Sequence, residues 1–301
     1  MIFEIKYIVV FLITIIPFAV WLYLFLWKRN LNKFVTAAVF AGGMIAAKLI
    51  LIYQDYWEKT INLIFFKVNP VNFRENIQLI FSSRPILALF LSFIGVGVME
   101  EFLKFLMLKT IGHRFFKSID DVIEMAIITA LGFAFFENIV YFFNQWGQLS
   151  TGTFMVFAIF RITIVTMVHI LCSGVLGYYF GMAFFASPVL KIEYLKKKKH
   201  PVLGFFSTIL HLKKENVYHD EMLLIGLVSA LSLHAIYDFV LSMEFVVLGL
   251  PLHIPIMLLY FFGGFWYLNH LLKKKELNIN LGLIGDKPVS REEFIKMIES
   301  E

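Results

Sequence analysis

Several ionisable residues lie inside strongly apolar stretches of the sequence. They are Glu100, Glu101, Lys104, Glu124, Glu137, Arg161, His169, His234 and Asp238. Each such charge costs roughly 2.5–3.5 kcal/mol at the centre of a bilayer, so a protein keeps several of them only if they meet one another or serve a function. Carboxylates and imidazoles are also the groups that activate water, transfer protons or bind a metal ion.

The spacing of these residues predicts which of them share a helix face. Three pairs are four residues apart and so lie on one face of a helix: Glu100 with Lys104, Glu137 with Tyr141, and His234 with Asp238. Glu100 and Glu101 are adjacent and point about 100° apart. One of the two can therefore face a cavity while the other contacts Lys104 or a neighbouring helix.

This set of residue types fits two hydrolytic sites. In the first, a glutamate in a low-dielectric pocket is the general base for a water, and a histidine stabilises the oxyanion or protonates the leaving amine. In the second, His169, His234 and one of Glu100 or Glu101 bind zinc, with water as the fourth ligand. The HExxH motif is absent, so zinc and a glutamate base both stay open.

The elements that must position these residues are membrane-spanning helices. Of the 301 residues, 59% are hydrophobic and only 16% are charged, and the mean hydropathy is +0.78, whereas soluble domains carry about 25% charged residues. Apolar runs near the ~20 residues that cross a bilayer occur at Tyr7–Trp27, Phe34–Tyr53, Pro85–Leu108, Val122–Phe143, Phe154–Phe185, Met222–Met243 and Leu252–Leu272. The sequence thus predicts an all-α polytopic integral membrane protein with about seven transmembrane helices and a polar intramembrane site.

The fifth apolar run, Phe154–Phe185, is longer than one span requires. We expect either that its start lies in the membrane interface or that the helix kinks near Ser173–Gly174 and Gly177. A rise of 1.5 Å per residue puts Glu100, His234, His169 and Glu137 at overlapping depths of roughly 12–25 Å from the inner surface. One polar cluster in the outer half of the hydrocarbon is therefore predicted.

The distribution of basic residues predicts the orientation of the chain. Most of the 27 lysines and arginines lie after the first, third, fifth and seventh runs. The positive-inside rule then places the N-terminus outside and the C-terminus in the cytoplasm of a multi-pass cell-membrane protein. Because the basic residues sit in short segments between apolar runs, the pI near 9.1 indicates topology signals and no nucleic-acid partner.

The chain is expected to form one domain. Residues 1–273 form the transmembrane helical domain, with a catalytic core at 85–243, and residues 274–301 form a cytoplasmic tail with a short helix after a capping box at Ser290. Two segments, Asp55–Arg84 outside and Lys191–Glu221 inside, are predicted to lie between spans. Arg161 is expected to pair with Glu137 or with a lipid phosphate, and Glu137 to bind Tyr141 or Arg161.

Four motifs follow one another in the sequence: Glu100-Glu101-Phe-Leu-Lys104, Phe136-Glu137-Asn138-Ile-Val-Tyr141, His169 followed by Gly174 and Gly177, and His234-Ala-Ile-Tyr-Asp238. In this order they resemble the motifs of the PrsW family of intramembrane proteases, which is distantly similar to the CAAX prenyl protease and bacteriocin-processing superfamily. They cover residues 85–243, half of the chain.

The resemblance implies a membrane-embedded peptidase, dependent on glutamate or on a metal such as zinc. It would make a first cut, on the extracytoplasmic side, in a single-pass membrane protein such as an anti-sigma factor. Glu100, Glu101 and His234 would be the primary catalytic residues, with His169 as the second imidazole and Asp238 as the group that orients His234. Lys104, Glu137, Tyr141 and Arg161 would support them.

Two other functions fit the same residues. Chains of glutamate and histidine also relay protons in transporters, so a proton- or cation-coupled transporter is an alternative, although inverted repeats and paired broken helices are absent. A catalytically silent relative that binds a membrane partner is the other.

Overall fold

The computed structural model describes residues 2–26, 32–60, 85–186, 189–190, 208–209, 212–242, 246–247, 250–251 and 253–277. Its long helices are α1 (Ile2–Leu26), α2 (Lys33–Thr60), α4 (Pro85–Met107), α5 (Ile119–Gln145), α6 (Thr151–Phe160), α7 (Thr166–Phe184), α10 (Lys214–Leu241) and α11 (His253–Leu277). Shorter helical turns are η2 (Leu108–Gly112), η3 (His113–Phe115) and η4 (Arg161–Val165). Two antiparallel two-residue strands, β1 (Val246–Val247) and β2 (Leu250–Pro251), precede α11.

The helices confirm an all-α polytopic membrane protein. Each of the seven predicted apolar runs coincides with a helix or, for the fifth, with the continuous rod of α6, η4 and α7. By length and composition, four helices can cross a membrane, at Lys33–Ile52, Ile119–Gln145, Thr151–Phe184 and Lys214–Leu241. Large apolar side chains such as Phe262, Leu259 and Val156 are exposed on the outside of the bundle, as lipid contact requires. The total of seven spans stays a prediction.

Helices α2 and α10 extend furthest beyond their predicted runs. Helix α2 continues to Thr60 and α10 begins at Lys214, so Asp55–Thr60 and Lys214–Glu221 are helical and do not belong to the connecting segments. Lys214 and Glu215 open α10 because a helix can continue out of the hydrocarbon wherever its polar side chains reach water. Residues 61–84, most of 191–211 and the predicted tail helix lie outside the described residues.

The irregularity of the fifth run lies elsewhere than predicted. The rod widens into one π-helical turn, η4, at Arg161–Val165, whereas α7 passes regularly through Ser173–Gly174 and Gly177. These small residues serve packing instead. A Cβ on Gly177 would come within 2.8 Å of the Ile123 Cα on α5.

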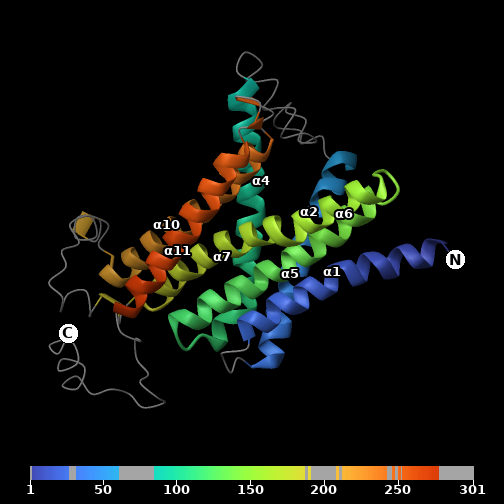
Figure 1. The fold of residues 1–301 in the computed structure, drawn as a ribbon. Coiled ribbons are helices and arrows are strands. Elements are labelled where there is room, and N and C mark those ends of the chain that lie inside the picture. The colour runs from blue at the N-terminus through green and yellow to red at the C-terminus, as the bar shows by residue number, and fades with distance from the viewer. Residues whose placement is uncertain are drawn as a thin grey trace.

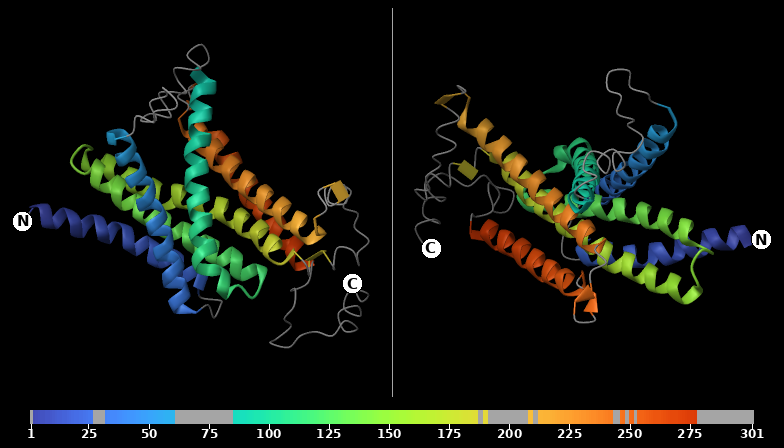
Figure 2. Two further views of the ribbon diagram at one scale, coloured as in Figure 1. Left: turned by 180° about the vertical axis from the view of Figure 1, so that it is seen from behind. Right: turned by 90° about the horizontal axis from the view of Figure 1, so that it is seen from above.

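Pairwise contacts between helices close a ring. Helix α2 packs on α5, α5 on α7, α7 on α10, α10 on α4, and α4 returns to α2. Figures 1 and 2 show α4 crossing the other helices steeply, with α1 lying along α5 and α11 beside α10. The inner faces of α4, α5, α7 and α10 therefore point toward one another, which is the arrangement a shared polar site needs.

The contact between α2 and α5 depends on two glycines. A Cβ on Gly43 would lie 1.9 Å from the Thr129 carbonyl oxygen, and a Cβ on Gly132 would lie 1.9 Å from the Phe40 carbonyl oxygen. No side chain fits at these distances, so the two backbones touch directly. Small residues are the usual means by which transmembrane helices approach this closely.

Local signals fix both ends of α5. Ser118 and Asp121 form a capping box at its start, which satisfies backbone N–H groups that the first helical turn leaves unpaired. Gly147 follows the end of α5 with φ 81°, a conformation that glycine adopts without steric cost. After this turn, α6 begins, and the Ser150 side chain caps its N-terminus.

Candidate active site

Glu101 is the most deeply buried carboxylate of the polar cluster. It is 1% exposed, and its Oε1 accepts hydrogen bonds from the Lys104 ammonium at 2.6 Å and from His234 Nδ1 at 2.7 Å. Helix α4 thus contributes both the charge and its counter-ion, while α10 contributes the imidazole. The His234 ring is oriented by Glu101 from a neighbouring helix.

Lys104 is enclosed on every side by partners. Its Nζ lies 2.6 Å from Glu101, 3.0 Å from His169 Nδ1 and 3.9 Å from Glu100 Oε2, and it sits 4.5 Å from the centroid of the Phe133 ring. A lysine can bury its charge in this way because the carboxylates neutralise it and the aromatic face is electron-rich. Lys104 joins α4 to α7.

His169 is held through both ring nitrogens. An ammonium group only donates hydrogen bonds, so Lys104 Nζ is the donor and His169 Nδ1 the acceptor of the bond between them. His169 Nε2 then carries the ring proton and donates it to Glu137 Oε2 at 3.1 Å. The rings of His169 and His234 lie 5.3 Å apart at 79°, so α7 and α10 bring the two imidazoles together as predicted.

Glu100 and Glu101 each have a buried Oε2 without a hydrogen-bond partner among the described residues, but only Glu101 is held at its other oxygen by Lys104 and His234. The Oε2 atom of Glu100 is the one that faces His234 Nε2. That oxygen lies 3.5 Å from His234 Nε2, and Asp238 Oδ2 lies 3.6 Å from the same nitrogen. While Nδ1 of His234 is bound to Glu101, its Nε2 therefore faces two carboxylates. The resemblance implied that Asp238 orients His234; Glu101 hydrogen-bonds one nitrogen of this ring and Asp238 lies within ion-pair distance of the other, so the role of Asp238 stays a prediction.

Glu137 links the cluster to Arg161. The Arg161 guanidinium pairs with Glu137 Oε2 at 3.1 Å, donates from Nε to Asn138 Oδ1 at 2.9 Å and stacks 3.6 Å from the centroid of the Tyr141 ring. The prediction that Arg161 pairs with Glu137 is confirmed. Tyr141 supports Arg161 through its ring face.

The cluster is open on one side. The side chains of Glu101 and Lys104 are 1% and 2% exposed, whereas those of Glu137 and Asp238 are 21% and 23% exposed. The exposed pair lies on α5 and α10, so a water or a peptide would reach the cluster from their side. The prediction of one shared polar cluster from four helices is therefore confirmed as geometry.

A divalent metal ion fits part of this donor set. Ligand atoms of a tetrahedral zinc ion with bonds of about 2.1 Å lie about 3.4 Å apart, and His234 Nε2 is 3.5 Å from Glu100 Oε2. Glu100, His169 and His234 offer three atoms within 4.8 Å of one another. His169 would join by giving up one of its two hydrogen bonds. The described carboxylates of the cluster also outnumber Lys104 and Arg161, which favours additional positive charge.

Two residues near the cluster were missed as site residues by sequence reasoning. Asn138 was quoted within a motif but given no role, and it is 0% exposed with its carbonyl bound to Arg161. A buried amide inside an apolar run was the available signal. The thiol of Cys172 lies within 4.8 Å of donor atoms of Glu101 and His234, and nothing in its sequence context distinguishes it from packing.

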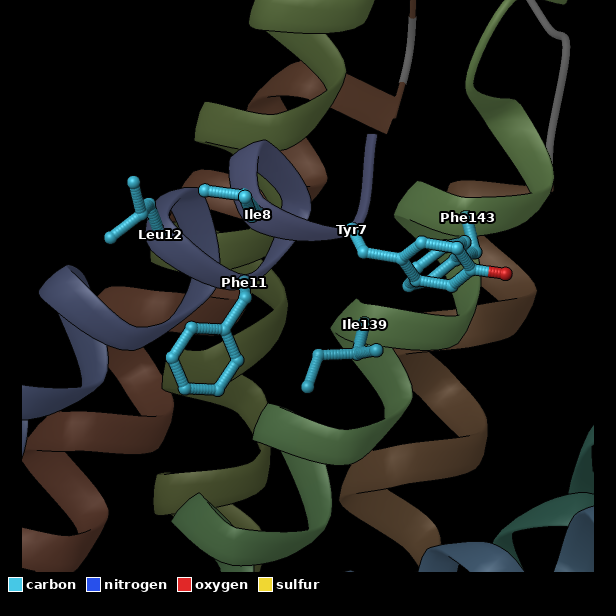
Figure 3. Close-up of a pocket in the computed structure, with 6 residues that line it drawn as sticks. All are labelled: Tyr7, Ile8, Phe11, Leu12, Ile139 and Phe143. Atoms are coloured by element: carbon cyan, nitrogen blue, oxygen red, sulfur yellow. The ribbon is translucent and has the colours of Figure 1, made fainter. Parts of the chain in front are cut away.

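A separate pocket of about 410 Å³ lies between α1 and α5. Figure 3 shows Tyr7, Ile8, Phe11 and Leu12 of α1 facing Ile139 and Phe143 of α5. It contains no carboxylate or imidazole, so it offers hydrocarbon contact and no hydrolytic chemistry.

Comparisons with known proteins agree with the motifs. A family model described as PrsW family intramembrane metalloprotease matches residues 32–264, a range that contains every residue of the cluster. The chain is 26% identical over 159 residues to Protease PrsW of Clostridioides difficile (strain 630), which covers 52% of this chain and 54% of that protein. The chain thus spans about half the length of this curated relative. No solved structure matches this chain. With more than half of its length matched by the family model, the chain belongs to the PrsW family of intramembrane metalloproteases.

Proposed function

We propose that this protein is an intramembrane protease that hydrolyses a peptide bond of a membrane protein at the polar cluster. The observation that carries the proposal is the buried Glu100 carboxylate, whose Oε2 lies 3.5 Å from His234 Nε2 without a hydrogen bond of its own. A base and an imidazole at this distance can both contact one water that lies beside them, and the partly exposed side of the cluster gives a peptide access.

The proposed residue roles follow from the hydrogen bonds. Glu100 removes a proton from the water, whose oxygen bonds to the scissile carbonyl carbon. A protonated His234, fixed by Glu101, delivers its Nε2 proton to the amide nitrogen as the carbon–nitrogen bond breaks, and the proton that Glu100 took from the water then restores His234. His169 is held by Lys104 and Glu137 beside the reacting atoms. Glu101 is thus a positioning residue, because Lys104 and His234 occupy its Oε1.

In a metal-dependent form of the proposal, Glu100, His234 and His169 would hold a divalent ion, with zinc as the candidate, and would act as its ligands in place of the base and acid roles above. When bound, such an ion would polarise the scissile carbonyl and activate the attacking water. The family description and the separation of the donor atoms support this cofactor. Asp238 lies close enough to His234 Nε2 that its carboxylate would help to balance the positive charge of a bound ion.

The finer account of the substrate is also a proposal. A single-pass membrane protein such as an anti-sigma factor, cut first on its extracytoplasmic side, is what the family resemblance implies. The predicted orientation, with the N-terminus outside, places the open side of the cluster in the outer half of the membrane. The domain limits, residues 1–273 with a catalytic core at 85–243 and a tail at 274–301, belong to the same proposal.

Four single variants test the proposed activity. Glu100→Gln, Glu101→Gln, His169→Ala and His234→Ala are each expected to insert normally and to lose cleavage of a co-expressed single-pass protein by about 10²–10⁴-fold, the usual contribution of a general acid or base. Cleavage retained in all four variants would refute the assignment. Glu101→Gln should also lower the thermal stability in detergent, since it leaves Lys104 short of a partner, whereas Glu100→Gln should not.

A further inference from the structure

Arg161 lies at the start of the only π-helical turn in the α6–α7 rod. It is eight residues before His169, and in a regular α-helix residues eight apart point about 80° away from each other. A π turn takes up one extra residue, which gives the pair the orientation of residues seven apart, about 20°. The π turn therefore brings Arg161 and His169 onto one face of the rod.

The observed contacts agree with this geometry. A single oxygen, Glu137 Oε2, lies 3.1 Å from the Arg161 guanidinium and 3.1 Å from His169 Nε2. The widened turn leaves the Arg161 carbonyl to accept from the backbone N–H and the hydroxyl of Thr166, and Thr166 is fully buried. The distortion is thus stabilised by its own sequence.

Arg161 uses its planar shape as well as its charge. Its Nε binds the Asn138 amide oxygen, another nitrogen pairs with Glu137, and its face stacks on Tyr141. A lysine has the same charge but cannot make these three contacts at once. Asn138 and Glu137 are adjacent on α5, so the guanidinium fixes the position of the Glu137 carboxylate along that helix.

We infer that Arg161, presented by the π turn η4, is a positioning residue that fixes Glu137 and through it the orientation of the His169 imidazole. The inference rests on the proposed proteolytic function. The proposed role differs from that of a simple ion pair in one respect: a positive charge at position 161 is not sufficient, and the planar guanidinium group is required.

The decisive variant is Arg161→Lys in the full-length protein. We expect kcat for a peptide spanning the cleavage site to fall about 10- to 100-fold, as small misplacements of a reacting group do, while KM changes by less than about twofold. Thr163→Ala is the matched control, because Thr163 is exposed on the same turn and its hydroxyl bonds back to the carbonyls of Ile159 and Phe160 on its own rod. It should leave both constants unchanged.

A second readout does not depend on turnover. In ¹⁵N-histidine-labelled protein, the His169 signal, assigned by its loss in His169→Ala, should report a proton on Nε2 in the wild type. Arg161→Lys and Asn138→Ala should reduce the population of that tautomer, and Thr163→Ala should not. The double variant Arg161→Lys, Glu137→Gln should lose little more of this tautomer than Glu137→Gln alone, since both changes act through one contact.

The outcomes separate the inference from the function beneath it. If the wild type cleaves and Arg161→Lys keeps the same kcat and the same His169 signal, the positioning role alone is overturned. Failure of the wild type to cleave any membrane protein would overturn the proposed function. If Arg161→Lys does not fold, Asn138→Ala carries the same two readouts, and normal values there would overturn the inference.

Discussion

Lys104 shows how a charge is accommodated within an apolar bundle. The four-residue spacing predicted a pair with Glu100, yet the shorter contact is with Glu101, three residues away. Both spacings place the groups on one helix face, and the sequence alone cannot decide between them because His234 from α10 draws Glu101 into position. At this scale the residue types were predictable and the partners were not.

Removing the Lys104 charge should destabilise the protein strongly. Lys104→Met leaves Glu101 and Glu100 without their cation, and breaking a buried pair in this way costs about 3–5 kcal/mol. We expect the unfolding midpoint in mixed micelles of increasing sodium dodecyl sulfate to fall accordingly. Lys109→Met is the matched control, since Lys109 is exposed near the end of the same helical segment. Equal effects of the two variants would contradict the account.

Metal removal tests the proposed cofactor. Treatment with 1,10-phenanthroline should abolish cleavage, and zinc should restore it, because Glu100 and His234 are placed to share one ion. The purified wild type should also retain zinc that His234→Ala loses, measured by elemental analysis. Full activity of a protein shown to be metal-free would leave Glu100 as the base without a metal.

At the scale of helices, the apolar runs predicted every long helix because their length matches the bilayer. The ends of the helices were predicted less accurately, as at the start of α10, because a helix can continue into water where hydropathy gives no signal. The π turn at Arg161–Val165 could not be predicted. Its residues include neither glycine nor proline, and the turn is favoured by contacts of Arg161 and Thr166 that exist only in the folded bundle.

The close approach of α2 and α5 gives a second stability test. Gly43→Ala should push the helices apart, because the new methyl group would meet backbone atoms, and overpacking of this kind costs about 1–3 kcal/mol. Gly263→Ala is the control, since a Cβ there has nothing within 4 Å. It should be neutral or stabilise α11 by up to about 1 kcal/mol. The same loss in both variants would argue against the glycine contact.

At the scale of the whole molecule, the ring of α2, α5, α7, α10 and α4 explains why the site residues are so far apart in sequence. The motifs predicted that four helices share a site, and periodicity placed their polar faces. The order of helices around the ring could not be derived from the sequence, since any bundle of these spans would satisfy the hydropathy pattern equally well.

Orientation in the membrane is testable with single cysteines. In a Cys172→Ser background, which removes the sole native cysteine, Thr151→Cys should react with a membrane-impermeant maleimide on intact cells. Lys213→Cys should react only after lysis, because the positive-inside rule places it in the cytoplasm. Both positions are exposed. The reverse pattern would show that the predicted orientation is wrong and that the open side of the cluster faces the inner half of the membrane.

The central claim is that the cluster around Glu100 and His234 hydrolyses peptide bonds in membrane proteins. The most direct measurement compares the new N-termini of membrane proteins in cells that express the wild type or Glu100→Gln at equal levels. The account predicts termini within or beside the transmembrane segment of single-pass proteins that are present with the wild type and absent with Glu100→Gln. Identical sets of termini in the two cultures would contradict it.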